Sequence, residues 1–192
     1  AYSVCTSKTN ELIVAGGTSS LNMAFGTPAS APSGGTDGFI AKLSSSGARQ
    51  RIIYTGTTFY DQVFFVATDD QNRVYAMGQT AGNMNMSPGV YGQLNGKHFV
   101  QQFNSDLTSL LRTTTFGKTG STQPSLSPSA FMVDVCGRIY ISGWGGGSNQ
   151  SYHNGLDNLF GFPTSADAFQ KSTDGSDFYL MVLGPNFSNL LY

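Results

Sequence analysis

Short apolar segments separated by polar and glycine-rich stretches recur along this chain in a fixed order. The segment NELIVAGGTSS, which begins at Asn10, is matched by NRVYAMGQTAG from Asn72 and by GRIYISGWGGG from Gly137. Each copy starts with a residue that tolerates a positive φ, followed by one polar residue and a β-branched or aromatic run, as a tight hairpin requires. The pattern predicts three hairpin turns, each followed by a β-strand, and its period of about sixty residues indicates a repeat architecture.

The same flanking strands accompany each copy. One apolar strand precedes each turn, at 2–5, 63–68 and 130–135. Another follows after a loop, at 37–43, 97–103 and 176–183. A further strand comes after a short polar turn, at 51–56, 110–117 and 190–192. Several are apolar on both faces, which indicates sheets packed between other sheets. The sequence therefore predicts an all-β fold of β-propeller blades with four antiparallel strands each. A two-sheet sandwich is the alternative, but it would not explain the regular period.

The repeat divides the whole chain, 1–192, into parts of one partial propeller. We expect an incomplete blade at 1–48, a blade at 49–107, a blade with a long inserted loop at 108–186, and the first strand of a next blade at 187–192. About three blades are fewer than a closed ring normally has, so the chain is interpreted as part of a larger propeller of roughly six to eight blades. The remainder of its own larger polypeptide is then its first expected partner.

Composition agrees with this fold and excludes two classes of partner. Of the 192 residues, 39% are hydrophobic and 12% aromatic, which is enough to fill a core, while 24 glycines disfavour helices. Only 11% are charged and the formal net charge is -1, so there is no basic surface for nucleic acid. No apolar run approaches the length of a membrane span. We therefore expect neither nucleic-acid binding nor membrane insertion.

The repeated segments resemble the bacterial β-propeller repeat known as SBBP. The resemblance is carried by NRVYAMGQT from Asn72, GRIYISGWGG from Gly137, GFPTSADAFQ at 161–170, SDFYLMVL from Ser176 and DGFIAKLSSSG from Asp37. The third unit is the closest match. The version with VCGRIYISGWGG is similar to repeats in very large secreted proteins on the surface of gliding bacteria, many of them exported by the type IX secretion system.

This resemblance implies an extracellular or cell-surface location and a non-enzymatic role as a scaffold or adhesin, with components of the secretion translocon as partners. It implies no catalytic residues and no cofactor. The motif positions are expected to be structural; they are Asp37, Phe39, Gly78, Phe99, Gly143 and Phe178. A carbohydrate- or protein-binding propeller is the alternative function, and a propeller hydrolase is the least favoured one.

Catalytic and phosphate-binding motifs are not matched. The glycines that follow Gly143 could expose backbone N–H groups to an anion, but no lysine follows and no helix pattern opens behind them, so they are interpreted as a strand end. The histidines His98 and His153 lie in different units with no local nucleophile signature. His98 takes the place of the small Gly38, and we expect it at the surface or in a cross-strand contact.

Acidic and thiol side chains offer weak candidates for metal and redox sites. Asp69, Asp70 and Asp174 lie in polar turns that do not match the twelve-residue calcium loop, so they are expected to accept hydrogen bonds from turn amides. Calcium binding stays open as an alternative. Cys5 and Cys136 lack zinc spacing and are expected to be one buried thiol and one turn thiol, with a mutual disulfide as the alternative.

The most individual feature is a longer loop in the third unit, which begins after Trp144. The loop includes NQSYHNGLDNLFGF at 149–162. The candidate binding residues are Trp144, Tyr152, His153, Leu159, Phe160 and Phe162. Aromatic rings and amides could stack a sugar or accept a protein partner. The alternative is that the apolar residues Leu159, Phe160 and Phe162 fold back onto the neighbouring blade. The exposure of Tyr152 and Phe160 discriminates between the two.

Overall fold

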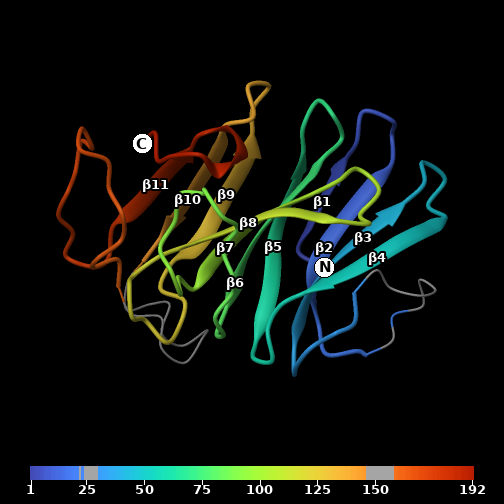
Figure 1. Ribbon diagram of the computed structural model, residues 1–192, viewed down its shortest axis with the longest axis horizontal. Coiled ribbons are helices and arrows are strands. Elements are labelled where there is room, and N and C mark those ends of the chain that lie inside the picture. Colours follow the sequence, from blue (N-terminus) through green and yellow to red (C-terminus); the bar gives the residue numbers. More distant parts are fainter. Residues whose placement is uncertain (22, 24–29, 146–157) are drawn as a thin grey trace.

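The computed structural model describes residues 1–21, 23, 30–145 and 158–192, and this part of the chain forms three antiparallel sheets (Figure 1). The strands are β1 (Ser3–Thr6), β2 (Leu12–Thr18), β3 (Asp37–Leu43) and β4 (Arg49–Thr55) in the first sheet, β5 (Asp61–Thr68), β6 (Val74–Thr80), β7 (His98–Phe103) and β8 (Leu110–Phe116) in the second, and β9 (Ser127–Val133), β10 (Ile139–Trp144) and β11 (Phe178–Leu183) in the third. A 3-10 turn, η2 (Pro185–Phe187), follows β11. The all-β prediction is confirmed, and among the described residues there is no helix with the length and apolar character needed to span a membrane.

The sheets divide the chain at other points than the predicted units. Arg49 begins β4, which pairs with β3 in the first sheet, and Leu110 begins β8, which pairs with β7 in the second. The segment that includes Leu190 lies beside β11 through a bridge to Leu183. A unit that begins at position 49 or 108 therefore takes its first strand from one sheet and its next strands from the following sheet.

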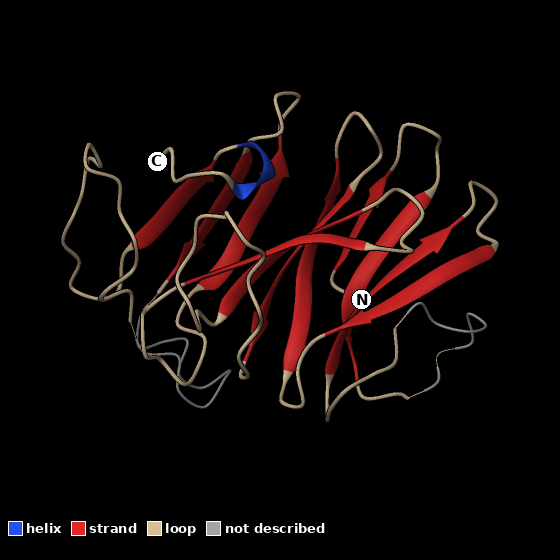
Figure 2. Cartoon of the chain, in the orientation of Figure 1, coloured by secondary structure: helices blue, strands red, loops and turns tan. Residues whose placement is uncertain are grey.

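The sheets stack face to face with the second sheet in the middle (Figures 1 and 2). One apolar cluster, which includes Ile13, Ile40, Val74 and Phe99, fills the space between the first and second sheets. Another lies between the second and third sheets and includes Tyr75, Met77, Val100, Ile139 and Met181. Strands β6 and β7 are buried at every position. The prediction of a sheet packed between other sheets is confirmed for the second sheet.

Each sheet has two different faces. We call the face toward the preceding sheet the back face and the opposite one the front face. In the second sheet Phe99 belongs to the back face and Val100 to the front face, because successive side chains of a strand point to opposite sides. The stack therefore has one sense, in which the front face of one sheet packs on the back face of the next.

The three predicted hairpin turns are confirmed by backbone geometry. Asn10, Asn72 and Gly137 have φ values of 61°, 57° and 76°. In the second turn the Asn72 N–H donates to the Asp69 carbonyl at 2.9 Å. Asparagine and glycine occupy these positions because they adopt the left-handed conformation at low cost.

The assignment of Phe178 as a structural motif position is wrong, because β11 pairs in a different register. In the earlier sheets Gly16 is paired with Phe39 and Gly78 with Phe99, whereas Gly143 is paired with Tyr179. Tyr179 therefore takes the position of the two phenylalanines, and Asp177 takes that of Asp37. A shift of one residue moves a side chain to the opposite face of a sheet. Phe178 accordingly lies on the front face of the third sheet and is 84% exposed.

The recurrence of glycine at these strand positions is explained by close backbone approach. A Cβ atom at Gly78 would lie 2.1 Å from the Gln62 carbonyl oxygen and 2.4 Å from Cζ of Phe99. A Cβ atom at Gly143 would lie 2.6 Å from the carbonyl oxygen of Ser127. No side chain fits at either position, which agrees with the structural role predicted for both glycines.

Candidate functional site: the β10–β11 loop and the face of β11

The described end of the inserted loop packs into the core. Leu159 is 4% exposed and Phe162 is 9% exposed, and both belong to the cluster between the second and third sheets. The Phe162 ring meets the Tyr179 ring edge-on, with 5.0 Å between the ring centroids. These two residues therefore close the gap between the two sheets, as the fold-back interpretation predicts.

Two other predicted residues, Phe160 and Trp144, do not belong to this cluster. Phe160 is 47% exposed, and Trp144 is half-buried at the end of β10, where it pairs in register with Phe178. Tyr152 and His153 lie outside the described residues. The structure thus divides the predicted site into a buried part, formed by Leu159 and Phe162, and the exposed side chain of Phe160.

His98 is buried where the second sheet packs against the third, and it does not lie at the surface. Its exposed fraction is 0%, its ring stacks on Phe116 at 5.3 Å, and the ring of Phe162 lies 5.9 Å away. Its Nε2 accepts hydrogen bonds from the backbone N–H groups of Ser125 and Leu126 at 3.3 and 3.2 Å. The surface position predicted for His98 is therefore wrong, because two aromatic rings, one of them from the loop, form a pocket that the sequence does not reveal. The predicted cross-strand contact is present, since Phe116 is its partner on β8.

Two neighbouring hollows lie between the loop and β11. The first has a volume of about 90 Å³ and the second about 220 Å³, and residues that line both are Thr164, Gln170, Phe178 and Tyr179. Phe169 stands beside the second hollow and is 97% exposed. The sequence alone does not single out Phe169, Gln170 or the exposure of Phe178. The AFQ segment at 168–170 belongs to the motif that resembles the SBBP repeat, and its pairing of an aromatic residue with an amide is the only signal of binding there.

Polar groups of the hollows are arranged by local hydrogen bonds. The Gln170 side-chain amide donates to the Ser172 carbonyl at 2.9 Å and to the Asp177 carboxylate at 3.1 Å. The Tyr179 hydroxyl donates to the Pro163 carbonyl at 2.6 Å, and burial, together with repulsion from Tyr91, raises the pKa of Tyr179 above its ordinary value. These contacts fix the loop against β11. They leave the exposed rings of Phe169 and Phe178 beside the hollows, where apolar surface is available for recognition.

The acidic turn residues divide into two groups. Both oxygens of Asp69 are occupied: Oδ1 accepts the N–H groups of Gln71 and Arg73 at 2.9 Å, and Oδ2 accepts Nε of Arg73 at 2.6 Å. Asp174 accepts the Ser176 N–H at 2.9 Å. The predicted turn-amide role is confirmed for these two residues.

Asp70 does not have the predicted role, because it forms an exposed ion pair with Lys8 at 2.7 Å. Within the described ranges no three His, Cys, Asp or Glu side chains come together as a metal site would require. Calcium binding stays a prediction from the sequence. Cys5 is half-buried in β1 and Cys136 is exposed in the β9–β10 turn, and both are free thiols.

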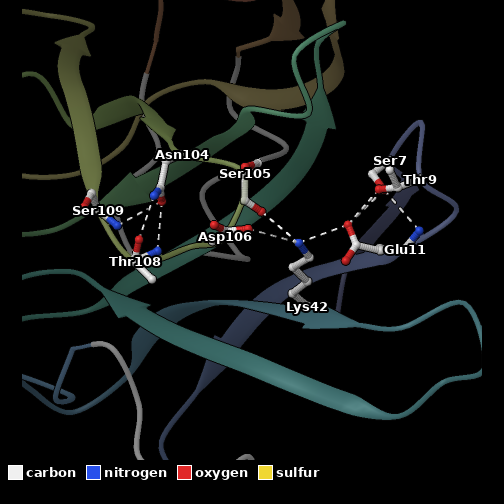
Figure 3. Close-up of polar contacts among 9 residues, drawn as sticks. All are labelled: Ser7, Thr9, Glu11, Lys42, Asn104, Ser105, Asp106, Thr108 and Ser109. Atoms are coloured by element: carbon white, nitrogen blue, oxygen red, sulfur yellow. Dashed lines mark hydrogen bonds and ion pairs between the residues drawn. The ribbon is translucent and has the colours of Figure 1, made fainter.

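A polar cluster of turn and strand residues joins the first and second sheets (Figure 3). The Lys42 ammonium group, on a side chain that is 9% exposed, lies 3.0 Å from Glu11 and 3.8 Å from Asp106. It also donates to the Ser105 carbonyl at 3.0 Å. Glu11 comes from the β1–β2 turn, and Asp106 and Ser105 come from the β7–β8 turn. The adjoining cavity of about 320 Å³ is flanked by these three paired charges and by Arg51.

Comparison with known proteins adds no relative to this picture. A scan against protein-family models finds no match to the chain, and a search of curated proteins finds no similar sequence.

Proposed function

We propose that this chain is a non-enzymatic segment of a β-propeller in a large exported cell-surface protein, where it serves as a scaffold or adhesin. The observation that supports this is the front face of the third sheet. Ile40, Val100 and Leu180 occupy matching register positions in the three sheets; the first two are 0% exposed beneath the next sheet, whereas Leu180 is 51% exposed. Exposed apolar faces of this kind are characteristic of surfaces that are covered in a complete assembly.

Further observations support a propeller. The sheets stack in one sense, the innermost strands β1 and β5 contact each other, and the long loops all leave the same ends of the sheets (Figure 1). Radial stacking of four-stranded sheets has these features. The resemblance to the SBBP repeat supports the surface location, the type IX secretion route and the non-enzymatic role.

The proposal is tested on the polypeptide that carries this sequence in its source cells. An antibody against the 192-residue chain would detect the polypeptide before and after intact cells are treated with a protease, and mass spectrometry would give its intact mass. We expect digestion from outside the cells and a mass that includes further copies of the repeat. A polypeptide that resists the protease on intact cells, or that has the mass of this chain alone, would contradict the proposal.

Glycan binding is the second candidate function, and the exposed aromatic residues of the β10–β11 loop favour it. Phe160 is 47% exposed, and Phe169, which is 97% exposed, lines the second hollow together with Gln170. Exposed aromatic rings supply the apolar contact area that a sugar ring can stack on. The test is a glycan array with the chain and its Phe160→Ala and Phe169→Ala variants. Phe59→Ala is the matched control, because Phe59 is 60% exposed in the β4–β5 connection. A glycan signal that both loop variants retain would exclude this site.

A further inference from the structure

Arg51 on β4 and Lys42 on β3 lie directly opposite each other in the first sheet. Both are cations, and like charges at opposite positions of a strand pair repel each other. Lys42 has close partners of its own, because its ammonium nitrogen lies 3.0 Å from Glu11 and 3.0 Å from the Ser105 carbonyl oxygen. Among the described residues, none accepts a hydrogen bond from the Arg51 guanidinium group or forms an ion pair with it. The half-buried Arg51 therefore carries a charge that the described part of the chain does not balance.

The second sheet shows an arginine at the same position together with its acceptor. Arg112 on β8 lies opposite Gln102 on β7, as Arg51 lies opposite Lys42. Nη1 of Arg112 donates to Oε1 of Gln102 at 2.8 Å, and Nε2 of Gln102 donates to the Tyr75 hydroxyl at 2.5 Å. A glutamine side chain can accept a hydrogen bond, whereas a lysine ammonium group can only donate. Lysine at this register position of the first sheet therefore leaves Arg51 without the acceptor that Arg112 has.

Arg51 borders the cavity of about 320 Å³ between the first and second sheets. The other residues that line this cavity are Glu11, Lys42, Gln50, Asp106 and Thr108. All of them lie within 11–108, so the cavity is formed without either end of the chain. Ligand sites in proteins range from about 300 to 1,000 Å³, so a cavity of this volume suits a small molecule.

Asp106 brings the opposite charge to the same cavity (Figure 3). Its side chain is 73% exposed, and its Oδ1 lies 3.8 Å from the Lys42 ammonium nitrogen, which Glu11 approaches more closely. Asp106 therefore keeps most of its capacity to accept hydrogen bonds. Oγ1 of Thr108 accepts a hydrogen bond from Nδ2 of Asn104 at 2.7 Å, so its own proton can be donated to a further acceptor.

We propose that this cavity binds a small amino acid as its zwitterion, with the carboxylate on Arg51 and the ammonium group on Asp106. A planar guanidinium group can donate two parallel hydrogen bonds to a carboxylate, and an ammonium group has three donors for the oxygens of Asp106. Thr108 Oγ1 is a further donor to the carboxylate. A simple anion would be repelled by Asp106 and a simple cation by Arg51, whereas a zwitterion is complementary to both. The site is independent of the scaffold or adhesin role.

The test is a titration of the full chain with amino acids whose two charged groups are progressively further apart. The four probes are glycine, β-alanine, 4-aminobutyrate and 5-aminopentanoate, while butyrate and butylamine each lack one of the two charges. The NMR signals of the Arg51 side-chain Nε–H group and of the Asp106 and Thr108 backbone amides report binding. We expect at least one probe to bind with a Kd of about 1 mM or tighter, and both single-charge compounds to bind about tenfold more weakly or less. No saturable shift with any of the four probes, or equal binding of butyrate, would overturn the proposal.

Arg51→Gln and Asp106→Asn are each expected to weaken binding of the best probe by about tenfold or more, because each removes one charged contact. Arg112→Gln is the matched control and should leave the affinity unchanged, since Arg112 has the same register position in the second sheet but does not line the cavity. Unchanged affinity in the Arg51→Gln variant would contradict the site. Tighter binding in the Asp106→Asn variant would contradict it as well, because it would show that Asp106 pairs with Arg51 and not with the ligand.

Discussion

The ammonium nitrogen of Lys42 and the carboxylate of Glu11 form a largely buried ion pair, 3.0 Å apart, at the contact between the first and second sheets. Burial opposes the charge on Glu11, but hydrogen bonds from Lys42 and Thr9 and the attraction of Lys42 outweigh it and lower the pKa of Glu11. Because Lys42 also donates to the second sheet, its positive charge joins two separate layers. The energetic value of this pair can be measured against an exposed one.

A Lys42→Met substitution is expected to lower the free energy of unfolding at pH 7 by about 2 kcal/mol, because it leaves Glu11 without its cation. The lowered pKa of Glu11 means that the pair stabilises above its unfolded pKa of about 4.3 and is lost as the pH falls through the folded-state pKa. The difference between the two proteins should therefore shrink below about pH 4. Urea titrations at several pH values provide the measurement.

Lys8→Met is the matched control for this experiment. Lys8 and Asp70 also connect the first two sheets, but their side chains are 60% and 56% exposed. Loss of an exposed pair should change stability by less than about 0.5 kcal/mol. An equal effect of the two substitutions would show that burial does not strengthen the Lys42 pair.

Asp61 is expected to destabilise the protein at neutral pH when it is ionised. Burial raises the pKa of Asp61, hydrogen bonds from Thr80 and Thr57 oppose this, and the charge of Asp37 adds to it. A raised folded-state pKa means that stability is fully present below the unfolded pKa of about 3.9 and is lost as the pH rises through the folded-state pKa. Asp61→Asn should therefore raise the melting temperature at pH 7 and leave it unchanged near pH 3.

Asp37→Asn serves as the comparison for Asp61. The Asp37 carboxylate accepts the N–H and hydroxyl of Ser33 at 3.1 and 2.9 Å and the N–H of Gly34 at 3.3 Å. Replacing the charged acceptor with an amide should weaken these bonds and lower the melting temperature. If Asp37→Asn raised the melting temperature as Asp61→Asn is expected to do, the predicted difference between the two carboxylates would be wrong.

Gly78 is expected to tolerate no side chain. An added Cβ would meet the Gln62 carbonyl and the Phe99 ring, so Gly78→Ala should cost about 3 kcal/mol of unfolding free energy. Gly35→Ala is the control, because nothing lies within 4 Å of its Cβ position. Its effect should stay within about 0.5 kcal/mol in the same denaturation experiment.

Phe162 is expected to be a structural residue of the loop. Phe162→Ala removes a ring that contacts both Tyr179 and His98, and it should cost about 3 kcal/mol. Phe169→Ala removes an exposed ring and should cost less than about 0.5 kcal/mol. Thermal unfolding of the two variants would measure the contrast, and similar losses would contradict the fold-back interpretation of the loop.

The two thiols are expected to differ in reactivity. Burial raises the pKa of Cys5 to about 11 despite a hydrogen bond with Thr68, so little thiolate forms at pH 8. Cys136 is exposed in its turn. Iodoacetamide should therefore alkylate Cys136 about tenfold faster or more, as peptide mass spectrometry would show. Equal rates would indicate that β1 opens readily.

Much of the strand pattern could be predicted because it depends on local chemistry. The turns at Asn10, Asn72 and Gly137 require a left-handed residue followed by a strand, and both requirements are visible in the sequence. The register of β11 could not be predicted in this way. Phe178 and Tyr179 are both aromatic, and the residue type alone favours Phe178 as the counterpart of Phe39 and Phe99. Only the pairing of Gly143 with Tyr179 shows that Tyr179 is the side chain that faces the core.

The surroundings of His98 and the hollow beside β11 also depend on distant segments. His98 is enclosed by Phe116 and Phe162, which come from a neighbouring strand and from a long loop. The hollow is formed between Phe169 and Phe178, and the sequence does not indicate that they approach each other. Residues whose environment is made by one turn were predictable, whereas those enclosed by three elements were not.

The complete burial of β6 and β7 has a consequence for how the molecule folds. Each face of the second sheet is covered by a different neighbour, so its stability is a sum of two nearest-neighbour interfaces, as in linear repeat proteins. Loss of either outer sheet would uncover one whole side of the middle one. The middle sheet is therefore the cooperative link of the molecule, and unfolding that begins in the first sheet should propagate through it to the third.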